Sequence, residues 1–228
     1  MKRLAVILVF ITLVPYYLLQ SGIAAAQHQG DQEESIHFLW AFGALRTGEG
    51  GARLIPIDRD TVLRTGDQIK FFVKLERPGF IYLIYHSSQG ELSVLFPYRF
   101  EQGALSGARY FIPQGAEWFQ LDEHVGQETF YLLASSTRLR ELEELINKYE
   151  TADPAKKRAL AKSIVEEIRT LIWKNRRFKT FAEKPVPIMG SLRGTEKLQT
   201  RGTPDVTSLA VDISGKKFYS RTFTIDHQ

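Results

Sequence analysis

The sequence predicts a mainly β fold, an antiparallel β-sandwich of immunoglobulin-like or similar type, with an inserted αα-hairpin. Short apolar or alternating runs recur between glycine- and proline-containing turns through most of the first 135 residues, which is typical of a sandwich or barrel. Between 136 and 174 the apolar period changes to three and four residues, which indicates helices. With 228 residues and 43% hydrophobic content, the chain can bury a sizeable core.

The first 26 residues have the pattern of a signal peptide. Two basic residues precede an apolar stretch from Leu4 to Leu19, and three alanines at 24–26 offer the small side chains that signal peptidase reads. We expect cleavage before Gln27 and export to the periplasm or the cell exterior. The alternative is an uncleaved membrane anchor, for which the apolar run is short. The polar residues 27–35 are expected to form a flexible N-terminus.

The strongest strand signals lie between Gly66 and Pro97, which we expect to form a three-stranded meander. Ile69 to Leu75 alternates apolar and polar side chains, the pattern of a strand with one face buried and the other in water. Phe80 to Tyr85 is apolar or aromatic at every position, as in a strand covered on both faces. Pro78-Gly79 predicts a type II turn between these runs, and Ser87 to Gly90 predicts the next turn.

Further strands are expected on both sides of this meander. Ile36 to Leu45 has the composition of a buried strand. The end of the chain predicts a hairpin of Asp205–Ile213 and Lys216–Ile225 across Ser214-Gly215. Residues 36–228 would then form a single sandwich domain of about eight to ten short strands. The short strands expected after the meander are Tyr110–Ile112, Glu117–Leu121 and Glu128–Ala134.

Residues 136–174 predict the helical hairpin. The first helix is expected to follow a serine cap at Ser135 or Ser136 and to run to about Tyr149. Asp153 is the expected cap of the second helix, whose first position holds a proline. Apolar residues at three- and four-residue steps indicate faces that pack on the sheet.

A basic loop, residues 175–204, follows the helices. From 173 to 201 the chain holds eight basic and two acidic residues. One interpretation is a flexible loop whose first cations complement the helix C-terminus. The other is a surface for acidic lipid headgroups or an anionic cell-surface polymer, with Arg176, Arg177 and Lys179 as candidate contacts.

No catalytic or cofactor-binding motif is found in the sequence. The absence of cysteine excludes disulfides, thiolate metal sites and a thiol nucleophile. The five histidines form no ligand pair of known spacing, and nucleotide-binding and nucleophile-elbow motifs are lacking. We therefore expect a protein without cofactor or metal that is not an enzyme. A hydrolase whose site is assembled by the fold is the third hypothesis.

Three residues that follow the meander are candidate binding residues. Tyr98, Arg99 and Phe100 place two rings and a guanidinium in one loop, a combination suited to a sugar or a peptide. The formal net charge of +4 is too small to indicate nucleic acid. We expect a protein partner in the envelope, with the anionic polymer or membrane surface as the alternative.

Several turn and core motifs resemble a known bacterial family. They are LRTGDQI (63–69), RPGFIYL (77–83), LFP (95–97) after Gly90, IP (112–113) and GQETFYLLAS (126–135). In combination they are similar to the domain of unknown function 4384, over roughly Ile36 to Ser135. The resemblance implies an all-β module of exported or envelope proteins, which in some multidomain proteins accompanies caspase-like peptidases or protein kinases. It implies an accessory binding or assembly role and no catalytic residues.

Overall fold

The computed structural model describes residues 35–48, 51–100, 104–176, 182–185 and 204–228. The predicted signal peptide and most of the predicted basic loop lie outside these residues, as do residues 27–34 of the predicted flexible N-terminus. Ser35 already belongs to a strand. None of the helices in the described ranges has the length and apolar character needed to cross a membrane.

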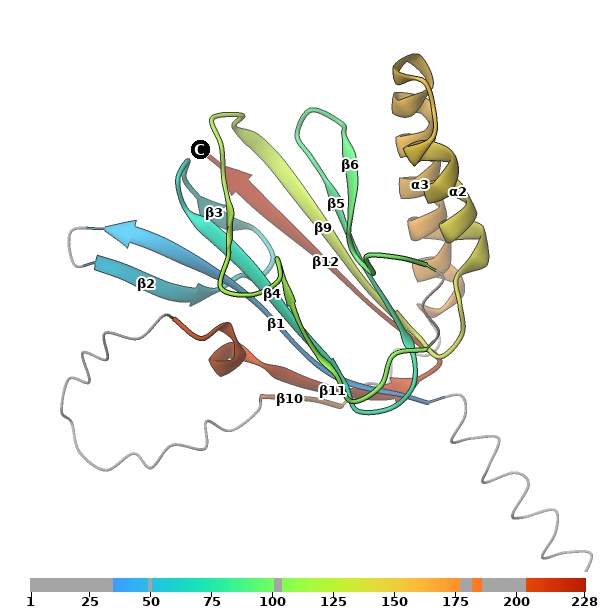
Figure 1. Ribbon diagram of the computed structural model, residues 1–228, viewed down its shortest axis with the longest axis horizontal. Helices are drawn as coiled ribbons and strands as arrows, with labels where there is room; N and C mark the ends of the chain where they lie inside the picture. The colour runs from blue at the N-terminus through green and yellow to red at the C-terminus, as the bar shows by residue number, and fades with distance from the viewer. Residues whose placement is uncertain (1–34, 49–50, 101–103, 177–181, 186–203) are drawn as a thin grey trace, which may run out of the picture. The chain divides into compact units, whose positions relative to one another are not determined.

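In the described part of the chain, two β-sheets and a pair of α-helices make up the fold (Figure 1). The helical elements are α2 (Arg140–Glu150), α3 (Pro154–Lys174) and the short 3-10 helix η2 (Val206–Leu209). The strands are β1 (Ser35–Gly48), β2 (Gly51–Pro56), β3 (Thr61–Leu63), β4 (Gln68–Leu75), β5 (Phe80–His86), β6 (Leu92–Phe96), β7 (Arg109–Ile112), β8 (Phe119–Gln120), β9 (Gly126–Ser135), β10 (Ala182–Pro185), β11 (Val211–Lys216) and β12 (Phe218–His227).

The described strands divide into two sheets, which confirms the mainly β sandwich. Sheet A has seven strands in the order β10-β11-β1-β4-β7, with β2 paired to β1 and β8 paired to β4. Sheet B has five, in the order β3-β12-β9-β5-β6. The expected strand number was too low, because very short strands such as β3 show no periodicity and β10 lies in the segment expected to be a loop. The fold is also not wholly antiparallel, since β3 pairs in parallel with β12.

The main core lies between the two sheets, and four phenylalanines meet in it. Phe42 of β1 and Phe71 of β4 stack with their ring centroids 3.5 Å apart. From sheet B, Phe130 and Phe223 approach Phe42 edge-on at 5.2 and 5.1 Å. All four are at most 2% exposed. Side chains of alternate residues therefore interlock across the sandwich, as the period of two in β4 predicts.

The predicted meander is wrong in its first connection. β4 lies in sheet A, whereas β5 and β6 pair with each other in sheet B. At Pro78-Gly79 the chain therefore crosses between the sheets. Gly79 does not have the positive φ of a type II turn and instead forms a bridge with Leu105. The second predicted turn is confirmed, because Gly90 N–H donates to the Ser87 carbonyl at 3.0 Å between β5 and β6.

The predicted C-terminal hairpin is also wrong. β11 belongs to sheet A and β12 to sheet B, and Ser214-Gly215 lies inside β11. The chain changes sheets at Lys217, whose φ is 58°. Before β11, residues expected to extend the strand form η2, because the Asp205 carboxylate accepts the Thr207 amide at 2.9 Å.

The helices α2 and α3 lie in the predicted hairpin region and cover the outer face of sheet B. Tyr82, Ile84 and Leu133 of the sheet form one buried cluster with apolar residues of both helices, including Ile146 and Ile164. α2 begins later than predicted, at Arg140, and its N-cap makes no side-chain hydrogen bond. α3 begins at Pro154 after Asp153, as predicted.

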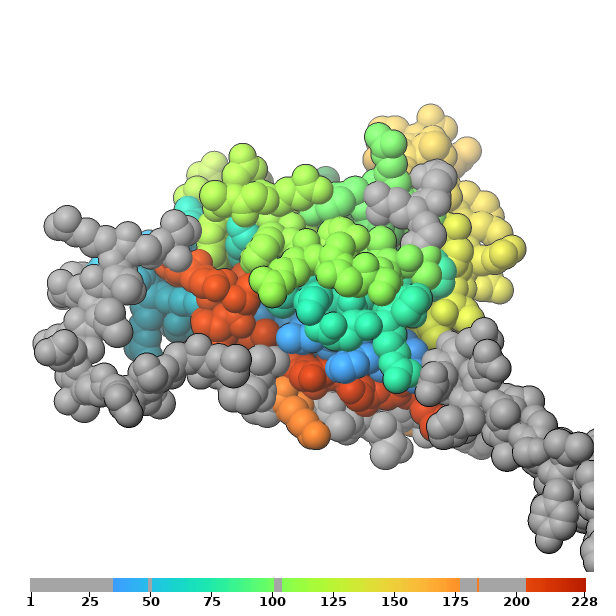
Figure 2. Space-filling view, turned by 60° about the horizontal axis from the view of Figure 1, so that its bottom comes forward, coloured from blue at the N-terminus to red at the C-terminus, as the bar shows by residue number. Residues whose placement is uncertain are grey.

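The outer face of sheet A is covered as well, so the prediction that one face of β4 meets water is wrong. Residues 204–210 lie beside the segment that contains β7 (Figure 2) and pack on Phe72. Lys70 is only 5% exposed. Its Nζ donates to the carbonyls of Gly115 at 2.7 Å and Glu117 at 2.5 Å, and burial lowers its pKa. The ammonium thus attaches the loop after β7 to the sheet.

Candidate functional site

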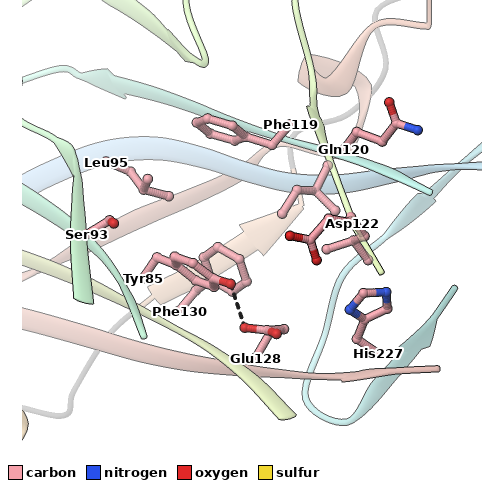
Figure 3. A pocket seen from close by; sticks show the side chains of 11 residues that line it. Tyr85, Ser93, Leu95, Phe119, Gln120, Asp122, Glu128, Phe130 and His227 are labelled. Carbon is pink, nitrogen blue, oxygen red and sulfur yellow. Dashed lines mark hydrogen bonds between the residues drawn. The ribbon is translucent and has the colours of Figure 1, made fainter. Parts of the chain in front are cut away.

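A cleft of about 320 Å³, which we name the edge cleft, opens between the two sheets beside β6 and β8 (Figure 3). β6 is the last strand of sheet B, and the two-residue β8 pairs with β4. The apolar lining residues are Ile69, Leu95, Phe119, Leu121 and Phe130. The polar lining residues are Tyr85, Ser93, Gln120, Asp122, Glu128 and His227.

Near the C-terminal end of β6, aromatic rings fill the gap between the two sheets. The Phe96 ring, at the end of β6, lies 4.9 Å from Tyr110 of β7 and 5.5 Å from Tyr98, centroid to centroid. β6 also has a bulge at Leu95, where the pairing steps from Val94 to Phe96. The gap between the sheets is therefore filled at one end of β6 and open at the other.

A buried carboxylate, Glu128 of β9, lies in the edge cleft and is 3% exposed. Its Oε2 accepts the Tyr85 hydroxyl at 2.6 Å and the Ser88 amide at 3.2 Å. Burial, together with this hydrogen bond, raises the pKa of Tyr85, so the phenol remains a donor. Among the described residues, no group donates a hydrogen bond to Oε1. Oε1 is not among the enclosed polar atoms of the described residues that lack a partner, so it faces the cleft and can accept a hydrogen bond from a ligand that supplies a donor.

An imidazole and a second carboxylate complete the polar side of the edge cleft. His227 is 2% exposed, and its Nε2 lies 3.2 Å from the Thr65 hydroxyl. Oδ1 of Asp122 accepts a hydrogen bond from the His124 backbone amide at 2.9 Å, and Oδ2 lies 3.0 Å from Nδ1 of the His124 ring. These bonds lower the pKa of Asp122 and raise that of His124. In Figure 3, Asp122 and His227 lie across the cleft from Ser93.

The Thr65 hydroxyl and the His227 imidazole have the group types of a nucleophile and its base. Such a pair needs a third group that orients the imidazole. No side chain in the part of the chain that the structure describes hydrogen-bonds Nδ1 of His227. Nor do three His, Asp or Glu residues there gather closely enough to hold a metal ion. The carboxylates of Asp122 and Glu128 on the cleft lining are suited to accepting hydrogen bonds from a ligand.

The loop residues predicted to bind a ligand do not line the edge cleft. The Tyr98 hydroxyl donates to the Phe111 carbonyl at 3.2 Å, although the residue is 43% exposed. Phe100 is half-buried against Tyr82, and its carbonyl accepts from Arg138. Arg99 is exposed. Tyr98 and Phe100 thus attach the loop to the sandwich.

Of the three predicted basic contacts, Arg176 is described, whereas Arg177 and Lys179 lie outside the described residues. The Arg176 guanidinium lies 4.4 Å from the ring centroid of Trp173, which is 62% exposed. This exposed pair suits an anionic surface. The anionic-polymer hypothesis otherwise concerns residues that the structure does not describe, and it stays a prediction.

Sequence reasoning missed the edge cleft, although one residue gave a signal. Glu128 is in phase with Phe130 and Leu132, which are buried in the main core. A carboxylate at an inward-facing position of a strand is unusual enough to mark a site. His227 and Asp122 give no local signal, because they join the cleft only through the pairing of distant strands.

The model of one protein family, Domain of unknown function (DUF4384), matches residues 62–138. This segment of the chain belongs to that family. No curated protein and no solved structure matches the chain. The DUF4384 segment begins within β3, ends before α2, and includes every lining residue of the edge cleft except His227.

Near the cleft, His86 is expected to make stability depend on pH. Burial lowers its pKa from 6.5, although Glu128 acts in the opposite direction. The unfolded chain therefore binds a proton more readily, and the free energy of unfolding should fall as the pH falls through about 6.5. Urea unfolding at pH 7.5 and 5.5 measures this, and His86→Gln should show a smaller loss between the two. Equal losses in both proteins would refute the role of His86.

Proposed function

We propose that the chain is a non-catalytic binding module that receives a protonated amine or guanidinium of a partner protein in the edge cleft. The observation that supports this proposal is the environment of the Glu128 carboxylate. Glu128 is a buried carboxylate that lines an open cleft with one oxygen that no described group bonds. A cation would satisfy that oxygen with a charge-assisted hydrogen bond, about twice as strong as a neutral one.

The walls of the edge cleft suit the rest of such a side chain. Ile69, Leu95 and Phe119 offer apolar surface to the methylene stem of a lysine or arginine. The volume of about 320 Å³ is at the small end of ligand pockets, which favours a single side chain over a large cofactor. Asp122 at the rim adds a second negative charge.

The compartment and the accessory role are also proposals. The signal-peptide pattern of residues 1–26 supports export to the periplasm or the cell exterior. Within DUF4384, the resemblance to modules that accompany peptidases or kinases supports an accessory binding or assembly role in the bacterial envelope. The partner would then be another envelope protein that presents a basic side chain.

Titration with n-butylammonium chloride, followed by amide NMR shifts of the labelled protein, tests the proposed site. We expect the shifts to concentrate at Ser93, Gln120 and Asp122, and to weaken in Glu128→Gln, which keeps the shape and an acceptor but loses the charge. Sodium butyrate is the matched probe of opposite charge and should leave these amides unchanged. Shifts of equal size in Glu128→Gln, or centred outside the cleft, would overturn the proposal.

A further inference from the structure

The outer edge of β6 lies at the mouth of the edge cleft. β6 is the last strand of sheet B and pairs with β5. The Leu92 amide donates to the Tyr149 hydroxyl of α2 at 3.0 Å, which identifies the side of β6 that points away from β5. Val94, two residues on, presents its backbone N–H and C=O to the same side. Among the described residues, no group outside the strand pairing of β5 and β6 forms a hydrogen bond with the N–H or C=O of Val94.

Side chains of β6 alternate between the edge cleft and the helices. Ser93 and Leu95 line the cleft, whereas Val94 packs in the cluster under α2 and α3. A strand added beyond β6 would continue sheet B and repeat this alternation. Every second side chain of such a strand would therefore lie over the cleft.

The charges around this edge favour a basic side chain at the central position. Glu128 and Asp122 line the cleft, and Glu91 directly precedes β6. The lining residues include no lysine or arginine. A lysine or arginine on an added strand would meet apolar walls along its stem and the Glu128 carboxylate at its end.

We infer that β6 accepts an extended segment of a partner protein as an additional β-strand, with one lysine or arginine directed at Oε1 of Glu128. This inference rests on the proposed function and specifies its partner. The segment has apolar residues two positions before and after the basic one, because these also face the apolar lining. Backbone hydrogen bonds to β6 supply affinity, and the cleft selects the side chain.

The experiment uses the purified protein and the peptide acetyl-TVTKTVT-amide, whose valines and lysine share one face in a strand. Two N-methylated versions of this peptide each remove the backbone N–H groups from one of its two edges. One is methylated at the threonines that flank the lysine, the other at the lysine and the last valine. In a strand, the amides of alternate residues point to opposite edges. One version should therefore bind about tenfold more weakly, because it loses bonds to β6, and the other should bind within about twofold of the parent.

The direction of pairing decides which version is weakened. In antiparallel pairing the threonine amides face β6, and in parallel pairing the lysine and valine amides do. Equal binding by the two versions, whether both weakened or both unchanged, overturns strand addition.

The two proposals fail in different ways. A peptide with norleucine in place of lysine should bind about tenfold more weakly if Glu128 takes the ammonium. Unchanged binding by the norleucine peptide overturns the proposed function, and with it this inference. If the lysine peptide does not bind while n-butylammonium still shifts the cleft amides, strand addition is overturned and the proposed function stands.

Discussion

Phe71→Ala is expected to lower the free energy of unfolding by about 3–5 kcal/mol. Phe71 is 1% exposed and stacks on Phe42 of the neighbouring strand. It also lies 5.5 Å from Phe130 across the sandwich, between ring centroids. Truncation therefore removes contacts to both sheets and leaves a cavity that the interlocked rings cannot fill. Urea unfolding followed by circular dichroism measures the change.

Tyr98→Ala is the matched control for that variant, because it removes an aromatic ring of similar size that is 43% exposed. The free energy of unfolding should fall by about 1 kcal/mol or less in Tyr98→Ala, since removal of this ring leaves no enclosed cavity. Comparable losses in the two variants would mean that Phe71 is not at the centre of an inter-sheet core. The arrangement of sheets A and B would then be wrong.

Glu143→Ala is expected to lower the free energy of unfolding by about 2–3 kcal/mol. Glu143 of α2 is 7% exposed, and its Oε1 accepts the Tyr82 hydroxyl at 2.6 Å. Its Oε2 accepts from Nη2 of Arg138 at 2.7 Å. Burial raises the pKa of Tyr82, so the phenol stays protonated and loses its acceptor in the variant. This network joins the first helix to β5.

The control is Glu144→Ala, one residue further along the same helix, where the side chain is exposed. Its loss should be within about 0.5 kcal/mol, because the substitution removes no buried hydrogen bond. If both variants lose the same small amount, the Tyr82–Glu143–Arg138 network does not stabilise the docked helices. Near-ultraviolet circular dichroism of the tyrosines gives a second readout of whether the helices remain docked.

Local periodicity predicted the strands well and their partners poorly. The alternation from Ile69 to Leu75 correctly predicts that Phe71 is buried in the core. The same pattern places Lys70 in water, because it contains no information about the segment 204–210 that covers this face. Likewise, Pro78-Gly79 suits both a hairpin turn and a crossover between sheets. Only the long-range pairing of β5 with β9 decides for the crossover.

The edge cleft was less predictable, because its lining residues include members of six strands that are spread along the chain. Glu128 was open to prediction, since its position in β9 is in phase with buried apolar residues. His227 was not, because its place depends on the pairing of the last strand with Gly126 at the start of β9. The loop aromatics had the composition of a binding site, but Phe100 packs against Tyr82.

Whether Glu128 makes the edge cleft selective for a cation is best measured in a thermodynamic cycle that combines one substitution with two probes. The dissociation constants of n-butylammonium and of uncharged 1-butanol would be measured by NMR for the unmodified protein and for Glu128→Gln. We expect the substitution to weaken the binding of n-butylammonium about tenfold, while the binding of 1-butanol changes by less than about twofold. An equal effect on both probes, or none on n-butylammonium, would contradict this selectivity.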